Sequence, residues 1–258
     1  MPRHSFHAAA AIAAITACVG LTACAGIGTD RQKTMSAEGR LQVAAEAEAA
    51  GNSQLALSMY REAADRDPGN VELQLRCADA LARSGRISQA RRLLTERLRT
   101  SPGQVELLRA VALTDLIAGD SAQAIAGLDR VLAVNPDDAR ALVDKAVALD
   151  LQGQHAAAQA IYRQVLAQTP DDLATRNNLA VSLMLEGRTA QALETLAPIE
   201  DADTASQRLK TNLGILYAAT GDAGRSQQLL GDRMTERELA AVTQALKAPA
   251  ADAGARQP

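Results

Sequence analysis

Small apolar residues recur along the middle of this chain every 34 residues, and two such series run in parallel. The first series is Ala44, Ala78, Ala112, Ala146, Ala180 and Gly214. The second series is Ala56, Ala90, Ala124, Ala158 and Ala192, with Ser226 in sixth place. A small side chain is needed where two helices of a hairpin press closely together. The spacing therefore predicts a row of similar helical hairpins instead of a single globular core.

The turns between the predicted helices are marked by glycine and proline with the same period. The glycines are Gly51, Gly85, Gly119, Gly153, Gly187 and Gly221, and the prolines are Pro68, Pro102, Pro136 and Pro170. Glycine ends a helix at no steric cost, because it adopts a positive φ angle. Proline lacks an amide proton and stops the second helix. Side chains next to the prolines are expected to cap the following helices, namely those of Asn70, Asp137, Asp138, Asp171 and Asp172.

This period and these residues resemble the tetratricopeptide repeat (TPR), from about Ala37 to Leu230. The resemblance implies an all-α fold, a right-handed superhelical solenoid of about six hairpins with a C-terminal capping helix. The predicted repeats are 37–70, 71–104, 105–138, 139–172, 173–206 and 207–230. Residues 231–247 are expected to form the capping helix, because Thr235 to Glu238 have capping-box spacing. The Ala- and Pro-rich residues 248–258 are expected to form a disordered tail.

The fifth repeat breaks the pattern. Pro198 stands inside its expected second helix, acidic residues follow, and Thr204 replaces the expected proline. A shortened helix and an irregular acidic loop are predicted there. The loop is either a tolerated irregularity or a contact for a partner.

The first residues form an export signal. Arg3 precedes an uncharged apolar run that is too short to span a bilayer. Residues 1–23 are therefore predicted to be a signal peptide. The segment Leu21-Thr22-Ala23-Cys24 resembles the bacterial lipobox, which implies lipidation of Cys24 and a membrane anchor. Residues 24–36 are then the lipidated cysteine and a flexible tether. Ala25, in place of Asp, favours the outer membrane, and an ordinary cleaved leader is the alternative.

Composition argues against several functions. Only 2% of residues are aromatic and the net charge is -3, so we expect no binding of nucleic acid, which would need basic grooves and stacking rings. His155 has no second ligand at metal-binding spacing. No nucleophile or phosphate-binding loop is present, so we expect no enzyme activity, cofactor or metal. After cleavage Cys77 is the one cysteine besides Cys24, which leaves no intramolecular disulfide.

In TPR arrays the concave face is lined by defined positions of the first helix, and these positions become more apolar along this chain. The predicted partner groove consists of Arg109, Leu113, Leu116, Ile117, Val143, Val147, Leu151, Asn177, Val181, Met184 and Leu185. We expect it to hold an amphipathic helix or an extended peptide. Glu38, Glu48, Glu72 and Asp79 are expected to form an acidic entrance that selects a basic flank. Alternatively, some of these residues pack against neighbouring hairpins. We expect Val147→Glu with Met184→Glu to abolish capture of the partner without affecting melting.

Two polar features stay open. Asn178 and Asn212 occupy a position from which a side chain can bond a ligand backbone. Arginines crowd the second helix of the second repeat, namely Arg86, Arg91, Arg92, Arg97 and Arg99. They are solvated, or they contact anionic lipid or an acidic partner.

A narrower resemblance concerns the lipobox together with the steps Asn177-Asn178-Leu179-Ala180 and Asn212-Leu213-Gly214. This combination is similar to TPR lipoproteins of tight-adherence (Tad/Flp) pilus assembly. The resemblance implies an assembly factor that is anchored in the outer membrane, faces the periplasm and binds a secretin or another pilus component. A general periplasmic adaptor for cell-wall enzymes, proteases or outer-membrane protein assembly is the alternative.

Overall fold

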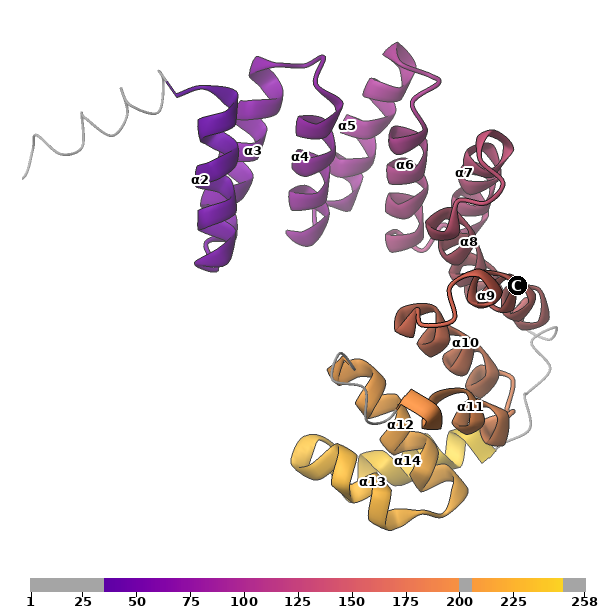
Figure 1. The fold of residues 1–258 in the computed structure, drawn as a ribbon. Helices are drawn as coiled ribbons and strands as arrows, with labels where there is room; N and C mark the ends of the chain where they lie inside the picture. The colour runs from indigo at the N-terminus through magenta and orange to yellow at the C-terminus, as the bar shows by residue number, and fades with distance from the viewer. Residues whose placement is uncertain (1–34, 200–205, 248–258) are drawn as a thin grey trace, which may run out of the picture. The chain divides into compact units, whose positions relative to one another are not determined.

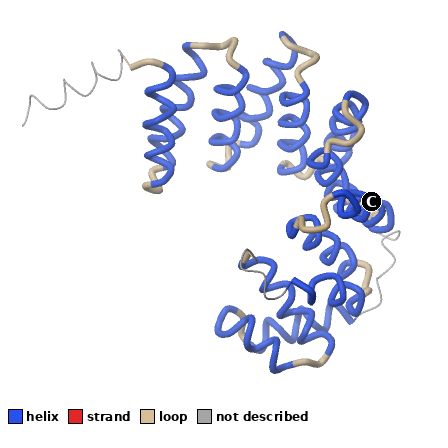
Figure 2. Tube along the Cα trace, viewed as in Figure 1, coloured by secondary structure: helices blue, strands red, loops and turns tan. Residues whose placement is uncertain are grey.

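The computed structural model describes residues 35–199 and 206–247, and every regular element in these ranges is helical (Figures 1 and 2). The first helices of the hairpins are α2 (Ala37–Ala49), α4 (Val71–Arg83), α6 (Val105–Ile117), α8 (Ala139–Leu151), α10 (Leu173–Leu185) and α12 (Gln207–Thr220). The second helices are α3 (Ser53–Arg66), α5 (Ile87–Thr100), α7 (Ser121–Val134), α9 (His155–Gln168), α11 (Thr189–Leu196) and α13 (Ala223–Leu230). The predicted all-α fold of helical hairpins is confirmed.

Each hairpin reverses at its periodic glycine. The six glycines have φ angles between 74° and 95°, a left-handed conformation that side chains with a Cβ rarely adopt. At α8 and α10, the first helices of the fourth and fifth hairpins, the residue before the helix caps it, whereas Gln104 forms no side-chain cap at α6. The Asp138 carboxylate accepts hydrogen bonds from the amides of Arg140 and Ala141, and that of Asp172 does the same at α10. The predicted glycine turns are confirmed, and so are the caps at Asn70, Asp138 and Asp172. Asp137 and Asp171 precede the capping residues and are not the N-caps.

The chain forms two compact units, Met1–Leu73 and Gln74–Pro258. In the described part of the first unit, α2 packs on α3. Arg40 is completely buried there, and its side chain pairs with Glu62 at 3.2 Å and donates to the Met35 carbonyl. The Tyr60 hydroxyl donates to Glu48 Oε2 at 3.1 Å and so ties the two helices of this hairpin together.

In the second unit, helices that follow one another along the chain pack together from α5 to α13. A continuous cluster of buried side chains, mostly Leu and Ala with two tyrosines, runs from α8 to α12. The small-residue series occupies the tight contacts, where Ala112, Ala146, Ala158 and Ala180 are fully buried. Helix α14 (Glu236–Lys247) packs on α12, and Thr235 and Glu238 form the capping box that their spacing predicts.

The fifth hairpin has a short second helix. Helix α11 has eight residues and continues into a 3-10 turn, Ala197–Ile199. The predicted acidic loop falls on residues 200–205, which lie outside the described part of the chain. The leader, Cys24, most of the tether and the tail 248–258 lie outside it as well.

Candidate partner-binding surface

The first helices of the second unit form a continuous layer. Helix α6 contacts α8, α8 contacts α10, and α10 contacts α12. Equivalent side chains of these helices therefore lie next to each other from hairpin to hairpin. The predicted groove residues all belong to α6, α8 and α10, so they share this layer.

Burial divides the eleven predicted residues into three groups. Leu113, Ile117, Leu151 and Leu185 are exposed. Asn177 is buried, and the remaining six are half-buried: Arg109, Leu116, Val143, Val147, Val181 and Met184. Only the first group offers a large apolar surface to a partner.

Three of the exposed residues form a series with the period of the repeat. Ile117, Leu151 and Leu185 are the last residues of α6, α8 and α10, and they are 54%, 62% and 55% exposed. Each side chain projects at the end of its helix, directly before the turn to the second helix. We call these three residues the aliphatic ladder. A single exposed aliphatic residue is ordinary, but a row at equivalent sites of adjacent helices marks an interaction surface.

The half-buried group contributes to the core, which corrects one sequence-based expectation. Val143, Val147 and Met184 pack against the cluster of buried side chains between α8 and α12. Glutamate at Val147 and Met184 would therefore disturb the core as well as the surface. We therefore expect this double substitution to lower the melting temperature, whereas the sequence suggested unchanged melting.

Asn212 forms a hydrogen bond with Asn177 of the preceding hairpin. Asn212 Nδ2 on α12 donates to Asn177 Oδ1 on α10 at 2.8 Å. This bond ties adjacent hairpins and occupies one amide that the sequence suggested for a ligand backbone. On α8, burial raises the pKa of the Asp144 carboxyl, while the charge of Arg109 opposes that shift.

A carboxylate inside the second unit gathers three side chains from α9 and α10. Asp150 on α8 accepts from the Tyr162 hydroxyl at 3.1 Å and from Ser182 Oγ at 2.6 Å, and His155 Nδ1 lies 2.9 Å from it. Burial next to Asp150 raises the pKa of Tyr162. The three side chains bond to Asp150 and so join α8, α9 and α10. We therefore interpret the cluster as structural. His155 is the first residue of α9.

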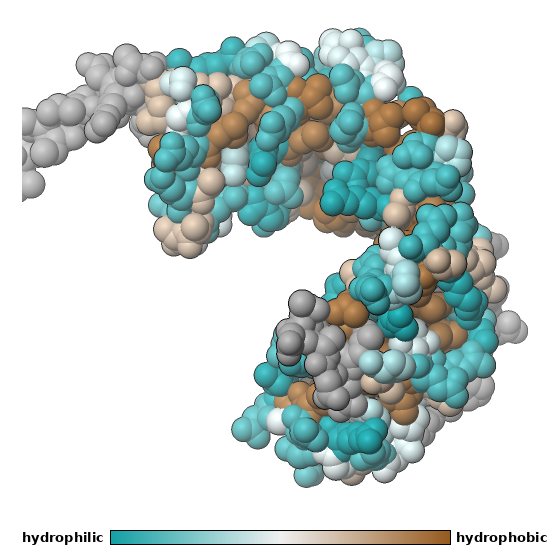
Figure 3. All heavy atoms as spheres, viewed as in Figure 1, coloured by the Kyte–Doolittle hydropathy of each residue, from teal (hydrophilic) through white to brown (hydrophobic). Residues whose placement is uncertain are grey.

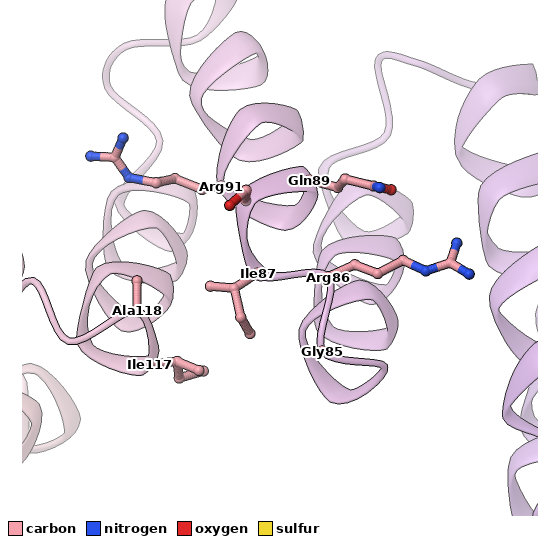
Figure 4. Close-up of a pocket in the computed structure, with 8 residues that line it drawn as sticks. Gly85, Arg86, Ile87, Gln89, Arg91, Ile117 and Ala118 are labelled. Carbon is pink, nitrogen blue, oxygen red and sulfur yellow. The ribbon is translucent and has the colours of Figure 1, made fainter.

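The basic helix α5 borders a hollow of about 650 Å³. The hollow is lined by Gly85, Arg86, Ile87, Ser88, Gln89, Arg91, Ile117 and Ala118. Figure 4 shows Ile87 directed toward Ile117 and Ala118, whereas the side chain of Arg86 extends away from them. Arg91 forms an ion pair with the buried carboxylate of Asp115. The aliphatic ladder thus continues into a hollow with an apolar wall and a basic rim.

The surface carries both apolar and hydrophilic side chains. Figure 3 shows apolar patches among mainly hydrophilic side chains on the face in view. Within the described residues no His, Cys, Asp or Glu side chains cluster in a way that could hold a metal ion. In the same ranges, no helix combines the length and apolar character needed to cross a membrane.

Comparison with protein families identifies the repeat. The tetratricopeptide repeat model matches residues 47–113, 115–179 and 151–213, which together make up more than half of the chain. The chain belongs to the tetratricopeptide repeat family. TPR domains bind protein partners, and proteins of this fold are typically non-enzymatic scaffolds. A search of curated proteins returned no match.

Solved structures share the fold at low identity. A TPR protein from Parabacteroides merdae is 16% identical with a TM-score of 0.71, over 86% of this chain and 89% of that one. TTC0263, a TPR protein from Thermus thermophilus, is 19% identical with a TM-score of 0.62, over 71% of this chain and 100% of that one. PilW, a type IV pilus biogenesis factor, is 20% identical with a TM-score of 0.66, over 80% of this chain and 97% of that one.

Proposed function

We propose that this chain is a non-enzymatic scaffold that binds a segment of a protein partner on the first-helix layer of its second unit. The observation that carries the proposal is the aliphatic ladder, Ile117, Leu151 and Leu185, each more than half exposed at the same place in three adjacent hairpins. Exposing this apolar surface to water is unfavourable, and a partner that covers it gains its burial free energy.

We further propose that the scaffold is held at the bacterial outer membrane, facing the periplasm, by lipid on Cys24. The support is the sequence of the leader, in which an uncharged apolar run ends in Leu21-Thr22-Ala23-Cys24. Two or three acyl chains anchor a protein stably, whereas one holds it only loosely.

Within this setting we propose a role in assembly of a Tad/Flp-type pilus, as a TadD-like lipoprotein that helps a secretin to localise or assemble. The support is the combination of the lipobox with the Asn-Leu-Ala and Asn-Leu-Gly steps of the last two repeats. PilW shows that a pilus biogenesis factor is built on this fold. At 20% identity that similarity concerns the fold, so the pilus role depends on the sequence motifs.

A general periplasmic adaptor is the second candidate. The ladder is purely aliphatic, and such a surface also suits cell-wall enzymes, proteases or outer-membrane protein assembly factors. Genes for a secretin, an assembly ATPase and small prepilins beside this gene would favour the pilus role, and genes for cell-wall enzymes would favour the adaptor.

The experiment is a crosslinking pull-down from membranes, with Cys24 intact, that compares the natural chain with Leu151→Glu/Leu185→Glu. We expect the double variant to lose at least tenfold of the recovered partner, because two carboxylates would have to be buried against apolar side chains. Its melting temperature should stay close to that of the natural chain, since both residues are more than half exposed.

The control is Val134→Glu. Val134 is 66% exposed at the end of α7, and its equivalents are Thr100 and Gln168, so it belongs to no ladder. It should retain the partner. Equal recovery with the double variant would contradict the proposed surface, and absence of a secretin among the partners of the natural chain would contradict the pilus role.

A further inference from the structure

We propose that the partner segment is an amphipathic α-helix with large aliphatic residues seven positions apart and with acidic side chains at the end that meets helix α5. This inference rests on the proposed function, because it specifies what occupies the same surface. It follows from the spacing of the aliphatic ladder and from the charges at one end of it.

The spacing of the ladder comes from the packing of the first helices. Ile117, Leu151 and Leu185 end three helices that contact each other in order, α6, α8 and α10. The axes of packed helices lie about 8–10 Å apart, and we take roughly 10 Å as the interval between consecutive ladder side chains. A partner that contacts all three must present apolar side chains at this interval along one face.

An α-helix meets this requirement. Seven residues of helix rise about 10.5 Å and make nearly two full turns, so residues i, i+7 and i+14 lie on one face at the right interval. A β-strand does not, because its same-face residues are about 6.8 Å or about 13.6 Å apart.

A polyproline helix repeats every three residues, about 9 Å, and so also fits the distance. Segments of this kind dock between exposed aromatic rings. The three tyrosines, Tyr60, Tyr162 and Tyr217, are at most 3% exposed, so no aromatic ring is exposed within the described residues. The surface is purely aliphatic, which favours the α-helix.

The charges near Ile117 set the polarity of the partner. In the preceding hairpin the residue equivalent to Ile117 is Arg83, whose charge is balanced by Asp79, so the charge available to a partner comes from Arg86. Arg86 borders the hollow next to Ile117, and its guanidinium makes no hydrogen bond or ion pair within the described residues. Carboxylates on the partner would therefore be favoured at this end.

The carboxylates of this region are already engaged. Asp79 pairs with Arg83 at 3.0 Å, Asp115 is buried against Arg91, and Asp120 caps α7 by accepting from the Gln123 amide. Helix α5 itself carries four arginines and one glutamate. This end therefore favours an acidic flank, in place of the basic flank that the sequence suggested for the entrance of the groove.

Figure 4 shows the residues that line the hollow next to Ile117. Ile87 points toward Ile117, and Arg86 lies beyond it and points away. An aliphatic side chain of the partner can follow the ladder onto Ile87, and a carboxylate about one heptad further along the partner helix can reach Arg86.

The test places a photocrosslinking amino acid at Ile117, Leu151 or Leu185 of the full chain, one site at a time, in cells. Mass spectrometry then identifies the partner residues that each site captures. We expect the three sites to capture one partner segment at positions about seven residues apart, with acidic residues beyond the residue captured from Ile117. A spacing of two to four residues, or scattered positions, would overturn the inference while leaving the proposed function intact. Absence of any captured protein at all three sites would contradict both the inference and the proposed function.

A charge variant tests the polarity separately. Arg86→Glu should lower the crosslinking yield from Leu151 about fivefold, because an exposed ion pair is replaced by repulsion. Arg130→Glu is the matched control, since Arg130 is an exposed arginine on α7 that does not line the hollow. Equal yields from the two variants would contradict the acidic flank, and restoration by lysine at the captured acidic residue would support it.

Discussion

Ser226 and Gly214 are the two exceptions in the small-residue series, and each exposes a different demand of close helix packing. Ser226 is 2% exposed, and its hydroxyl has no hydrogen-bond partner within the described residues. Gly214 lies where a Cβ would come within 2.6 Å of Leu230 Cγ. The first site contains a polar atom that the packing does not need, and the second has no room for even one methyl group.

These two residues give a prediction with opposite signs. Ser226→Ala should raise the free energy of unfolding by about 1 kcal/mol, because an unpaired buried hydroxyl is removed. Gly214→Ala should lower it by about 1 kcal/mol. Overpacking costs about 1–3 kcal/mol, and the better helix propensity of alanine returns only about 0.5–1 kcal/mol. Urea unfolding of both variants checks the pair. A stabilised Gly214→Ala would mean that Leu230 moves aside freely.

Side-chain bonds between helices could not be predicted from single positions. Tyr60 and Tyr162 are buried packing rings, 3% and 1% exposed. Their bonds to Glu48 and Asp150 depend on how the two helices of a hairpin are rotated against each other. The pattern of the repeat does contain the signal, because both tyrosines follow their carboxylate by twelve residues.

At the scale of the element, α8 shows what the sequence could and could not predict. Its start, its aspartate cap and its glycine turn follow from the periodic residues. The degree to which each side chain of α8 is buried does not follow from them. Val147 packs against the core, whereas Leu151, one turn later, is 62% exposed because the helix ends there. Family positions identify the face, but the neighbouring side chains decide how much of each residue reaches the surface.

This difference within α8 gives the next prediction. Val147→Glu should lower the free energy of unfolding by at least about 2 kcal/mol, because it places a carboxylate against the core cluster. Leu151→Glu should change it by less than about 0.5 kcal/mol, as is usual for surface substitutions. Thermal unfolding followed by circular dichroism distinguishes the two. Similar losses in both variants would indicate that Leu151 is also part of the core.

At the scale of the whole molecule, the sequence predicted the repeated hairpin and the final capping helix but not the division of the chain. The glycine and alanine series run through Leu73 without interruption, yet the structure divides into two compact units, Met1–Leu73 and Gln74–Pro258. A periodic pattern specifies that each hairpin resembles its neighbour. The pattern does not indicate how strongly neighbouring hairpins interact.

The capping helix gives a prediction at this scale. In a repeat array stability comes from each hairpin and its contacts with its neighbours, so removal of a cap weakens the nearest hairpin most. A chain without residues 231–258 should lose hydrogen-exchange protection mainly in α12 and α13, because α14 packs on α12. Protection in α6 and α7 should be almost unchanged. A uniform loss across both regions would show that the second unit unfolds as one cooperative block.

The paired tyrosine and carboxylate also constrain how such a chain can be recombined. Tyr60 with Glu48, and Tyr162 with Asp150, each lie within one hairpin, whereas the other hairpins have leucine at the tyrosine's place and Ala, Leu or Met at the carboxylate's. A genetic crossover between hairpins transfers both halves of the pair together. A crossover at a glycine turn separates them and leaves a carboxylate or a phenol without its partner in an apolar contact. Duplication and shuffling of these modules must therefore keep whole hairpins intact.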